Sequence, residues 1–189
     1  LACERGQHRV FESVQFDLHG GQWLHLLGDN GSGKTSLLRV LCGLSQAAEG
    51  QIMWRGHDAL APESGYRHEC LYMGHTLALK EELSALENLM FNAAISGHAM
   101  TREAAIKALA QQGLQGKEQL PLQVLSQGQK RRCALARVVP GQHTLWLLDE
   151  PFVALDAHAT EQFCGLLGQH LSLGGMVILT SHQSVALAG

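Results

Sequence analysis

The pattern of hydrophobic and polar positions predicts a series of short strands. Residues 14–18 (VQFDL) alternate between apolar and polar side chains, which is typical of a half-buried strand. Apolar runs predict strands at 23–28, 144–151 and 176–182, and short strands are predicted at 51–54 and 70–74. The strands at 144–151 and 176–182 end in polar residues, so functional polar side chains are expected at those strand ends.

Helices are predicted where apolar residues recur on one face. Three stretches have this spacing, 34–44, 101–114 and 156–171. Thr101 and Asp156 stand where an N-cap side chain accepts free backbone N–H groups. Ser84 and Glu87 form an S-x-x-E capping box, which predicts one more helix start ahead of NLMF.

The order of these elements predicts an α/β fold. Buried strands that alternate with helices indicate a mainly parallel sheet covered on both faces. The block at about 76–135 holds helices without a strand between them, so we expect a helical subdomain inserted into a core of residues 1–75 and 136–189. A chain of 189 residues suits one such domain.

Composition narrows the classes of function. The chain is 46% hydrophobic, so a packed core is expected, and its 14 basic and 17 acidic residues give a net charge of −3. That charge argues against a nucleic-acid partner. The five cysteines have no CxxC spacing and indicate reduced thiols in a cytosolic protein. The eleven histidines are scattered, and no built-in metal site is expected from them.

Nothing in the sequence predicts direct membrane insertion. No apolar run approaches the roughly 18–20 residues of a membrane span, and the start, LACERGQHRV, lacks the apolar region of a signal peptide. Any association with a membrane is therefore expected to go through a partner protein.

The sequence GDNGSGKT, which begins at Gly28, matches the phosphate loop G-x-x-x-x-G-K-[ST] between a predicted strand and a predicted helix. Gly28, Gly31 and Gly33 let the backbone approach phosphates closely. Lys34 is expected on the β- and γ-phosphates, and the Thr35 hydroxyl on Mg²⁺. The remaining nucleotide-binding positions of this loop are Asp29, Asn30, Ser32 and Ser36.

Acidic residues follow the predicted strand LWLL. Asp149 and Glu150 stand at its carboxyl end, which is the ligand side of an open parallel sheet. Asp149 suits Mg²⁺, and Glu150 suits polarising a water that attacks a phosphate. His182 follows the last predicted strand in the same way and could donate to a γ-phosphate.

A second glycine-containing helix start lies at LSQGQ. Ser126 and Gln129 form an S-x-x-Q capping box, and Gly128 falls in the first turn, where glycine is unfavourable for the helix. A free helix N-terminus is an anion site. Because the chain already has a complete phosphate loop, this second site is expected to close over the nucleotide of a neighbouring subunit.

GDNGSGKT, LSQGQ, LLDEP, the ALD at 154–156 and His182 occur in the order typical of ATP-binding subunits of ABC transporters, and they span nearly the whole chain. The chain resembles that family, which implies an ABC ATPase with a P-loop NTPase core. In that family two domains stack head to tail and sandwich two ATP. The resemblance therefore implies ATP and Mg²⁺ as cofactors and a second copy of the chain as partner.

The resemblance also implies a role for each motif residue. Lys34 binds phosphates, Thr35 and Asp149 serve Mg²⁺, Glu150 is the catalytic carboxylate, and His182 is the switch histidine. The dimer-facing D-loop contains Asp156. The signature that contacts the partner's nucleotide comprises Leu125, Ser126, Gln127, Gly128 and Gln129.

Four positions depart from the family pattern. Gln127 stands in the place of a glycine of the signature, and Val153 where a serine is usual. His75 occupies the place of the Q-loop glutamine, so a catalytic role there falls to a histidine. Arg5 stands where an aromatic ring normally stacks on adenine, and its guanidinium plane could stack instead.

Residues 72–91 (YMGHTLALKEELSALENLMF) resemble the same stretch in the ATP-binding subunits of the cytochrome c maturation system, the haem exporter. This narrower resemblance implies a peripheral ATPase on the cytoplasmic face of a bacterial inner membrane. Separate integral membrane subunits would be its partners, with residues 75–91 as the docking surface.

Three alternatives remain at this point. The chain could serve another ABC transporter. It could be a soluble ABC ATPase acting on DNA or ribosomes, although those usually carry coiled-coil insertions or two cassettes. A small-molecule kinase with a P-loop is the third, but a kinase would not need LSQGQ or ALD, and no arginine-rich lid is visible.

Overall fold

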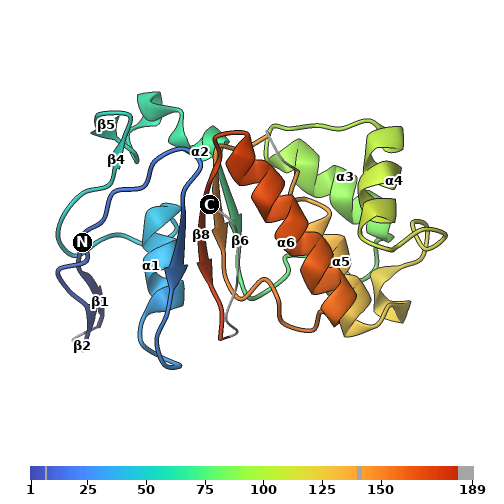
Figure 1. Ribbon diagram of the computed structural model, residues 1–189, viewed down its shortest axis with the longest axis horizontal. Helices are drawn as coiled ribbons and strands as arrows, with labels where there is room; N and C mark the ends of the chain where they lie inside the picture. Colours follow the sequence, from blue (N-terminus) through green and yellow to red (C-terminus); the bar gives the residue numbers. More distant parts are fainter. Residues whose placement is uncertain (7, 140–141, 183–189) are drawn as a thin grey trace.

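The computed structural model, shown in Figure 1, describes residues 1–6, 8–139 and 142–182. The strands are β1 (Cys3–Arg5), β2 (His8–Phe11), β3 (Trp23–Leu26), β4 (Met53–Trp54), β5 (His57–Asp58), β6 (Cys70–Met73), β7 (Leu145–Leu148) and β8 (Met176–Thr180). The α-helices are α1 (Lys34–Leu41), α2 (Tyr66–Glu69), α3 (Ala85–Ile95), α4 (Arg102–Gln111), α5 (Gln127–Leu135) and α6 (Ala157–Ser172). Short 3-10 helices lie at η1 (Pro62–Ser64) and η2 (Leu122–Val124).

The central sheet has four parallel strands in the order β3-β8-β7-β6, which confirms the predicted mainly parallel sheet. The strand predicted at 51–54 forms only as β4, which pairs antiparallel with β5 outside this sheet. Every residue of β7 and β8 is buried. Strands that are covered on both faces need apolar side chains at every position, which explains their continuous apolar sequence. Because all four strands run the same way, the segments that follow β3, β6, β7 and β8 lie along one edge of the sheet.

Helices cover both faces of this sheet (Figure 1). Leu145 and Leu147 of β7 pack with α1, whereas Trp146 and Leu148 pack on the opposite face with α5 and α6. Successive residues of a strand point to opposite faces, so one strand supplies both halves of the core.

The strand predicted at 14–18 is wrong. Only Val14 of this stretch pairs with another backbone segment among the described residues, and it exchanges hydrogen bonds of 3.0 and 2.6 Å with Leu1. Val14, Phe16 and Leu18 nevertheless pack against the α1 side of the core. The alternation therefore reports burial on one side, and burial alone does not provide the neighbouring backbone that a strand requires.

The block at 76–135 contains α3, α4 and α5 and, apart from the single bridge between Ser84 and Pro121, no β pairing in a stretch that the structure describes completely. These helices share an apolar cluster that includes Leu86, Leu109 and Cys133. The caps predicted for α3 and α4 are confirmed. Ser84 and Glu87 form the capping box of α3, and the Thr101 side chain accepts the N–H of Ala104 at α4.

The described part of the chain contains no helix that is both long and apolar enough to cross a membrane. The five cysteines are unpaired thiols, two of them buried. Histidines are not confined to the surface, because His143 and His170 are buried. Among the described residues, no group of three or more His, Cys, Asp or Glu could hold a metal ion.

Candidate nucleotide-binding site

The phosphate loop connects β3 to α1, as predicted. Gly28, Gly31 and Gly33 have φ angles of 146°, 84° and 95°, a region that favours glycine. A Cβ on Gly33 would lie 2.7 Å from Cγ1 of Val10. Gly33 is the N-cap of α1 and no side chain caps this end, so the first N–H groups of α1 are free to face an anion.

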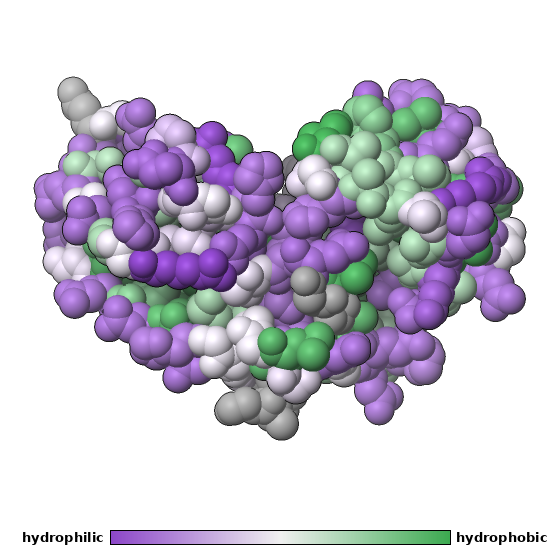
Figure 2. All heavy atoms as spheres, turned by 90° about the horizontal axis from the view of Figure 1, so that it is seen from above, coloured by the Kyte–Doolittle hydropathy of each residue, from purple (hydrophilic) through white to green (hydrophobic). Residues whose placement is uncertain are grey.

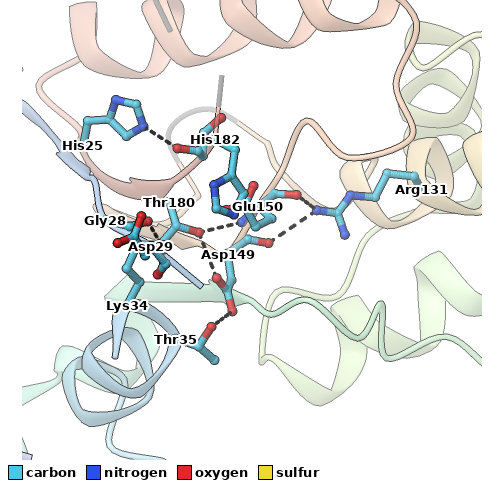
Figure 3. Close-up of polar contacts among 11 residues, drawn as sticks. His25, Gly28, Asp29, Lys34, Thr35, Arg131, Asp149, Glu150, Thr180 and His182 are labelled. Carbon is cyan, nitrogen blue, oxygen red and sulfur yellow. Dashed lines mark hydrogen bonds and ion pairs between the residues drawn. The ribbon is translucent and has the colours of Figure 1, made fainter. Parts of the chain in front are cut away.

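Lys34 lies across this loop. Its Nζ donates to the carbonyl oxygens of Gly28 at 2.6 Å and of Asp29 at 2.9 Å (Figure 3). The contacts hold the ammonium over the loop, where it can add its charge to the backbone N–H groups. This is the placement that a lysine needs to bind the outer phosphates of a nucleotide.

Asp149 connects the loop to the end of β7. The Thr35 hydroxyl donates to Asp149 Oδ2 at 2.8 Å, and the Thr180 hydroxyl donates to Asp149 Oδ1 at 2.8 Å. Thr180 also accepts the N–H of Glu150 at 2.8 Å (Figure 3). One buried hydroxyl thus orients both acidic positions. The sequence did not single out Thr180, although its place at the end of an apolar strand, two residues before the predicted site residue His182, was a usable signal.

Glu150 has an unusual backbone and an incompletely bonded carboxylate. Its φ of 51° lies in the left-handed region, which costs a non-glycine residue roughly 1–2 kcal/mol. Its Oε1 is buried without a hydrogen-bond partner, and His182 Nε2 lies 3.5 Å away, within ion-pair range but long for a hydrogen bond. A strained backbone and an unsatisfied carboxylate oxygen are typical of functional positions.

Arg131 of α5 is a second residue that the sequence did not reveal. It is 4% exposed, and its guanidinium donates to the backbone carbonyls of Asp149, Glu150 and Pro151 (Figure 3). Burial lowers the pKa of Arg131, while the charges of Asp149 and Glu150 oppose that shift. Its position in an otherwise polar helix start gave no sign of these backbone contacts.

A cavity of about 390 Å³ brings most of the predicted site together. It lies where β3, β6, β7 and β8 end, and its walls come from the phosphate loop and from more distant segments. The predicted residues that line it are Arg5, Asn30, Gly31, Gly33, Lys34, Thr35, Ser36, His75, Asp149, Glu150 and His182. Gly28, Asp29 and Ser32 belong to the same loop but do not line the cavity.

The signature residues 125–129 do not line this cavity and form the start of α5. The capping box is confirmed: Ser126 Oγ accepts the N–H of Gln129 at 3.3 Å, and Gln129 Oε1 accepts the N–H of Ser126 at 3.0 Å. Ser126 and Gln127 are exposed, whereas Leu125 is buried. The helix start therefore presents polar groups to solvent outside the cavity of this chain's own phosphate loop.

Gly128 and Asp156 connect α5 to the segment after β7. A Cβ on Gly128 would lie 3.0 Å from the carbonyl oxygen of Ala154, so glycine here permits close packing within the chain itself. Asp156 caps α6 by accepting the N–H of Ala159 at 2.8 Å, as predicted, and it also pairs with Arg132. The hydrogen bond from Ala159 is the main reason that the pKa of Asp156 is lowered, with the positive charge of Arg132 adding to it.

Comparisons with known proteins identify the family. The ABC transporter family matches residues 11–153. The cytochrome c biogenesis ATP-binding export protein CcmA of Dechloromonas aromatica is 48% identical over 98% of this chain and 91% of its own length. The CcmA proteins of Nitrosomonas europaea and Pseudomonas aeruginosa are each 46% identical, over 100% and 99% of this chain and 88% and 92% of their own lengths.

Solved structures give the same fold. The ATP-binding cassette MJ0796, in a dimeric post-hydrolysis state bound to ADP and Pi, has a TM-score of 0.83 at 23% identity and covers 96% of this chain and 84% of its own. The ATP-binding subunit of an ABC transporter has a TM-score of 0.79 at 25% identity, covering 96% and 77%. The sequence matches show that the chain belongs to the ABC transporter ATP-binding family and, within it, to the CcmA proteins.

Proposed function

We propose that this chain is the ATP-binding and ATP-hydrolysing subunit of the ABC complex that exports haem in cytochrome c maturation. The observation that supports the activity best is the 2.8 Å hydrogen bond from Thr35 to Asp149, which joins the phosphate loop to the acidic end of β7 in one cavity. The CcmA family membership supports the biological role.

ATP would bind with its phosphates on the loop and the N-terminus of α1, held by Lys34. Arg5 lines the same cavity and would stack its guanidinium on the adenine. A hydroxyl and a carboxylate are the oxygen donors that Mg²⁺ prefers, so Thr35 and Asp149 fit this ion. When bound, Mg²⁺ would neutralise phosphate charge in the cavity.

For hydrolysis, Glu150 would accept a hydrogen bond from the attacking water through its unsatisfied Oε1. The water oxygen bonds to the γ-phosphorus, the bond to the β–γ bridging oxygen breaks, and the water proton leaves toward Glu150. His182, 3.5 Å from Glu150, would donate to a γ-phosphate oxygen. His75 follows β6 into the same cavity and would help to hold the water.

Two copies of the chain would assemble head to tail around two ATP. The exposed start of α5, with Ser126 and Gly128, offers an anion site outside the cavity of its own loop, so it suits the γ-phosphate in a partner's loop. Asp156 lies on the same side of the chain, paired with Arg132 of α5, and would face the partner as part of the D-loop.

The membrane subunits would dock on the helical subdomain, at residues 75–91 and the face of α3 that continues from them. Phe91 is 41% exposed and Ile95 is 71% exposed, one turn apart on α3. Lys80 lies over the Phe91 ring at 4.5 Å. Figure 2 shows apolar surface on the lobe that carries α3 and α4, beside a hollow between the two lobes. This arrangement would place the chain peripherally on the cytoplasmic face of the inner membrane.

The proposal is tested by finding what the closed form binds. Tagged Glu150→Gln protein is expressed in a bacterium with a complete cytochrome c maturation system, membranes are solubilised gently in MgATP, and bound proteins are identified by mass spectrometry. We expect the small membrane and haem-handling proteins of that system, and Lys34→Ala as a control should lose them. Another permease would reject the haem role, and recovery only with ribosomes or DNA would indicate a soluble ABC ATPase.

A further inference from the structure

One face of α5 packs along the whole segment from the catalytic acid to the D-loop. Gly128, Arg131 and Arg132 have the i, i+3, i+4 spacing that places residues on one side of a helix. Gly128 approaches the carbonyl of Ala154, and Arg132 pairs with Asp156. The start of α5 is thus fixed against the same segment that carries Glu150.

Arg131 makes the contacts nearest the chemistry. Its Nε donates to the carbonyl of Pro151 at 3.2 Å, and its Nη2 donates to the carbonyls of Asp149, at 3.4 Å, and Glu150. Arg131 forms no ion pair among the described residues. The hydrogen bonds of its guanidinium all go to backbone carbonyls. Three successive carbonyls held by one planar guanidinium fix the peptide planes on both sides of Glu150.

This contact matters because Glu150 is not in a relaxed conformation. Its φ of 51° persists only if the surroundings determine it. The hydroxyl of Thr180 holds the N–H of Glu150, and Arg131 holds its carbonyl. Thr180 belongs to the sheet, whereas Arg131 belongs to α5, so movement of α5 would reach Glu150 through the guanidinium.

We propose that Arg131 is a positioning residue for Glu150 of its own chain and connects the signature at the start of α5 to that carboxylate. A nucleotide in the partner's loop orders α5, and Arg131 then sets the geometry of hydrolysis at the other of the two sites. This inference rests on the proposed head-to-tail dimer, and it adds a direct connection between the two ATP sites.

The first test compares Arg131→Met and Arg131→Lys with Lys130→Met as the matched control. Lys130 is the preceding residue of α5, is similarly buried, and pairs with Glu81 away from the site. We expect Arg131→Met to lower kcat about 10- to 100-fold, the effect of a misplacement of order 1 Å, with the KM for ATP changed less than about twofold. Arg131→Lys, which keeps a donor, should fall between, and Lys130→Met should match the parent protein.

A loss of folding is separated from a loss of positioning by the melting temperature and by dimer trapping. If Arg131→Lys melts like the parent protein and still forms the MgATP dimer when combined with Glu150→Gln, any fall in its kcat reports on positioning. Unchanged kcat in both Arg131 variants overturns the inference. If Glu150→Gln alone forms no dimer in MgATP, the proposed dimer itself fails, which is a different result.

Mixed dimers then show which site Arg131 serves. One protomer carries Glu150→Gln, so only its partner hydrolyses ATP, and the single-turnover rate at that competent site is measured. Arg131→Met should leave this rate within about twofold when it is on the Glu150→Gln chain, but lower it about 10- to 100-fold when it is on the competent chain. The opposite pattern, or equal effects in both placements, overturns the inference.

Discussion

The Thr35 hydroxyl donates a 2.8 Å hydrogen bond to Asp149 Oδ2 across 114 residues of sequence. The bond places the start of α1 against the end of β7, so the phosphate loop and the acidic strand end form one site. The same two oxygens are those proposed for Mg²⁺, which makes their pairing a direct target for mutation.

Thr35→Val should weaken magnesium-dependent nucleotide binding without abolishing contact with the phosphates. Lys34 and the loop N–H groups remain, but one oxygen donor and the partner of Asp149 are lost. We expect the Mg²⁺ concentration needed for half-maximal ATP binding to rise by about 10-fold or more, a typical cost when the shell of a metal site is altered. Fluorescent ATP binding titrated with Mg²⁺, and repeated in EDTA, measures this. Equal weakening in EDTA would contradict a role at the metal.

Glu150→Gln should retain ATP binding and accumulate the closed dimer. The amide keeps the shape of the side chain, but it cannot act as the base, and general bases contribute about 10²–10⁴-fold to rate. Size-exclusion chromatography coupled to light scattering, with and without MgATP, measures the dimer, and phosphate release measures kcat. A monomer under both conditions at saturating ATP would contradict the head-to-tail assembly.

Thr180→Val should reduce both activity and stability, because Val has nearly the shape of Thr but no hydroxyl. Thr180 is fully buried, and its loss leaves Asp149 Oδ1 and the N–H of Glu150 without their partner. We expect the free energy of unfolding to fall by about 1–3 kcal/mol. Chemical denaturation measures this, and Thr180→Ser is the matched control that should retain most of the stability. If Thr180→Val is as stable as the parent protein, other groups must replace the hydrogen bonds that Thr180 makes with Asp149 and Glu150.

Local sequence information predicted the parts of this molecule whose chemistry lies within a few residues. The phosphate loop and the cap at Ser126 are of this kind, because spacing alone sets their geometry. Thr180 and Arg131 were missed because their partners, Asp149 to Pro151, lie in a segment distant in sequence, and no motif spacing connects them to it. The prediction of a strand at 14–18 was wrong for a related reason. Alternating apolar and polar residues indicate burial on one side, but they do not show that a neighbouring strand is present to pair with.

Gly128→Ala should disturb the packing of α5 even though alanine is favourable in a helix. Replacing glycine would favour an exposed helix by about 1 kcal/mol, but the added Cβ would lie 3.0 Å from the Ala154 carbonyl, so that carbonyl must shift. Gly165→Ala in α6 is the control, because nothing lies within 4 Å of its Cβ position. We expect Gly165→Ala to raise the melting temperature and Gly128→Ala to show no gain and to weaken the MgATP dimer of Glu150→Gln. An equal rise of the melting temperature in both variants would show that the Ala154 carbonyl moves aside at little cost.

The stability of the folded chain should fall on mild acidification because of His143. Burial, with added repulsion from His98, Arg137 and His170, lowers the pKa of His143 to about 4 from its ordinary 6.5. Its Nδ1 is buried without a partner, and its ring lies 4.3 Å from that of His98. The unfolded chain binds a proton at this position below pH 6.5, and the folded chain does so only near pH 4, so the contribution to stability is complete above 6.5 and is lost as the pH falls toward 4. Melting temperatures measured from pH 7.5 to pH 5 should therefore decrease less in His143→Phe than in the parent protein. An identical pH dependence in the two proteins would assign the acid sensitivity to other groups.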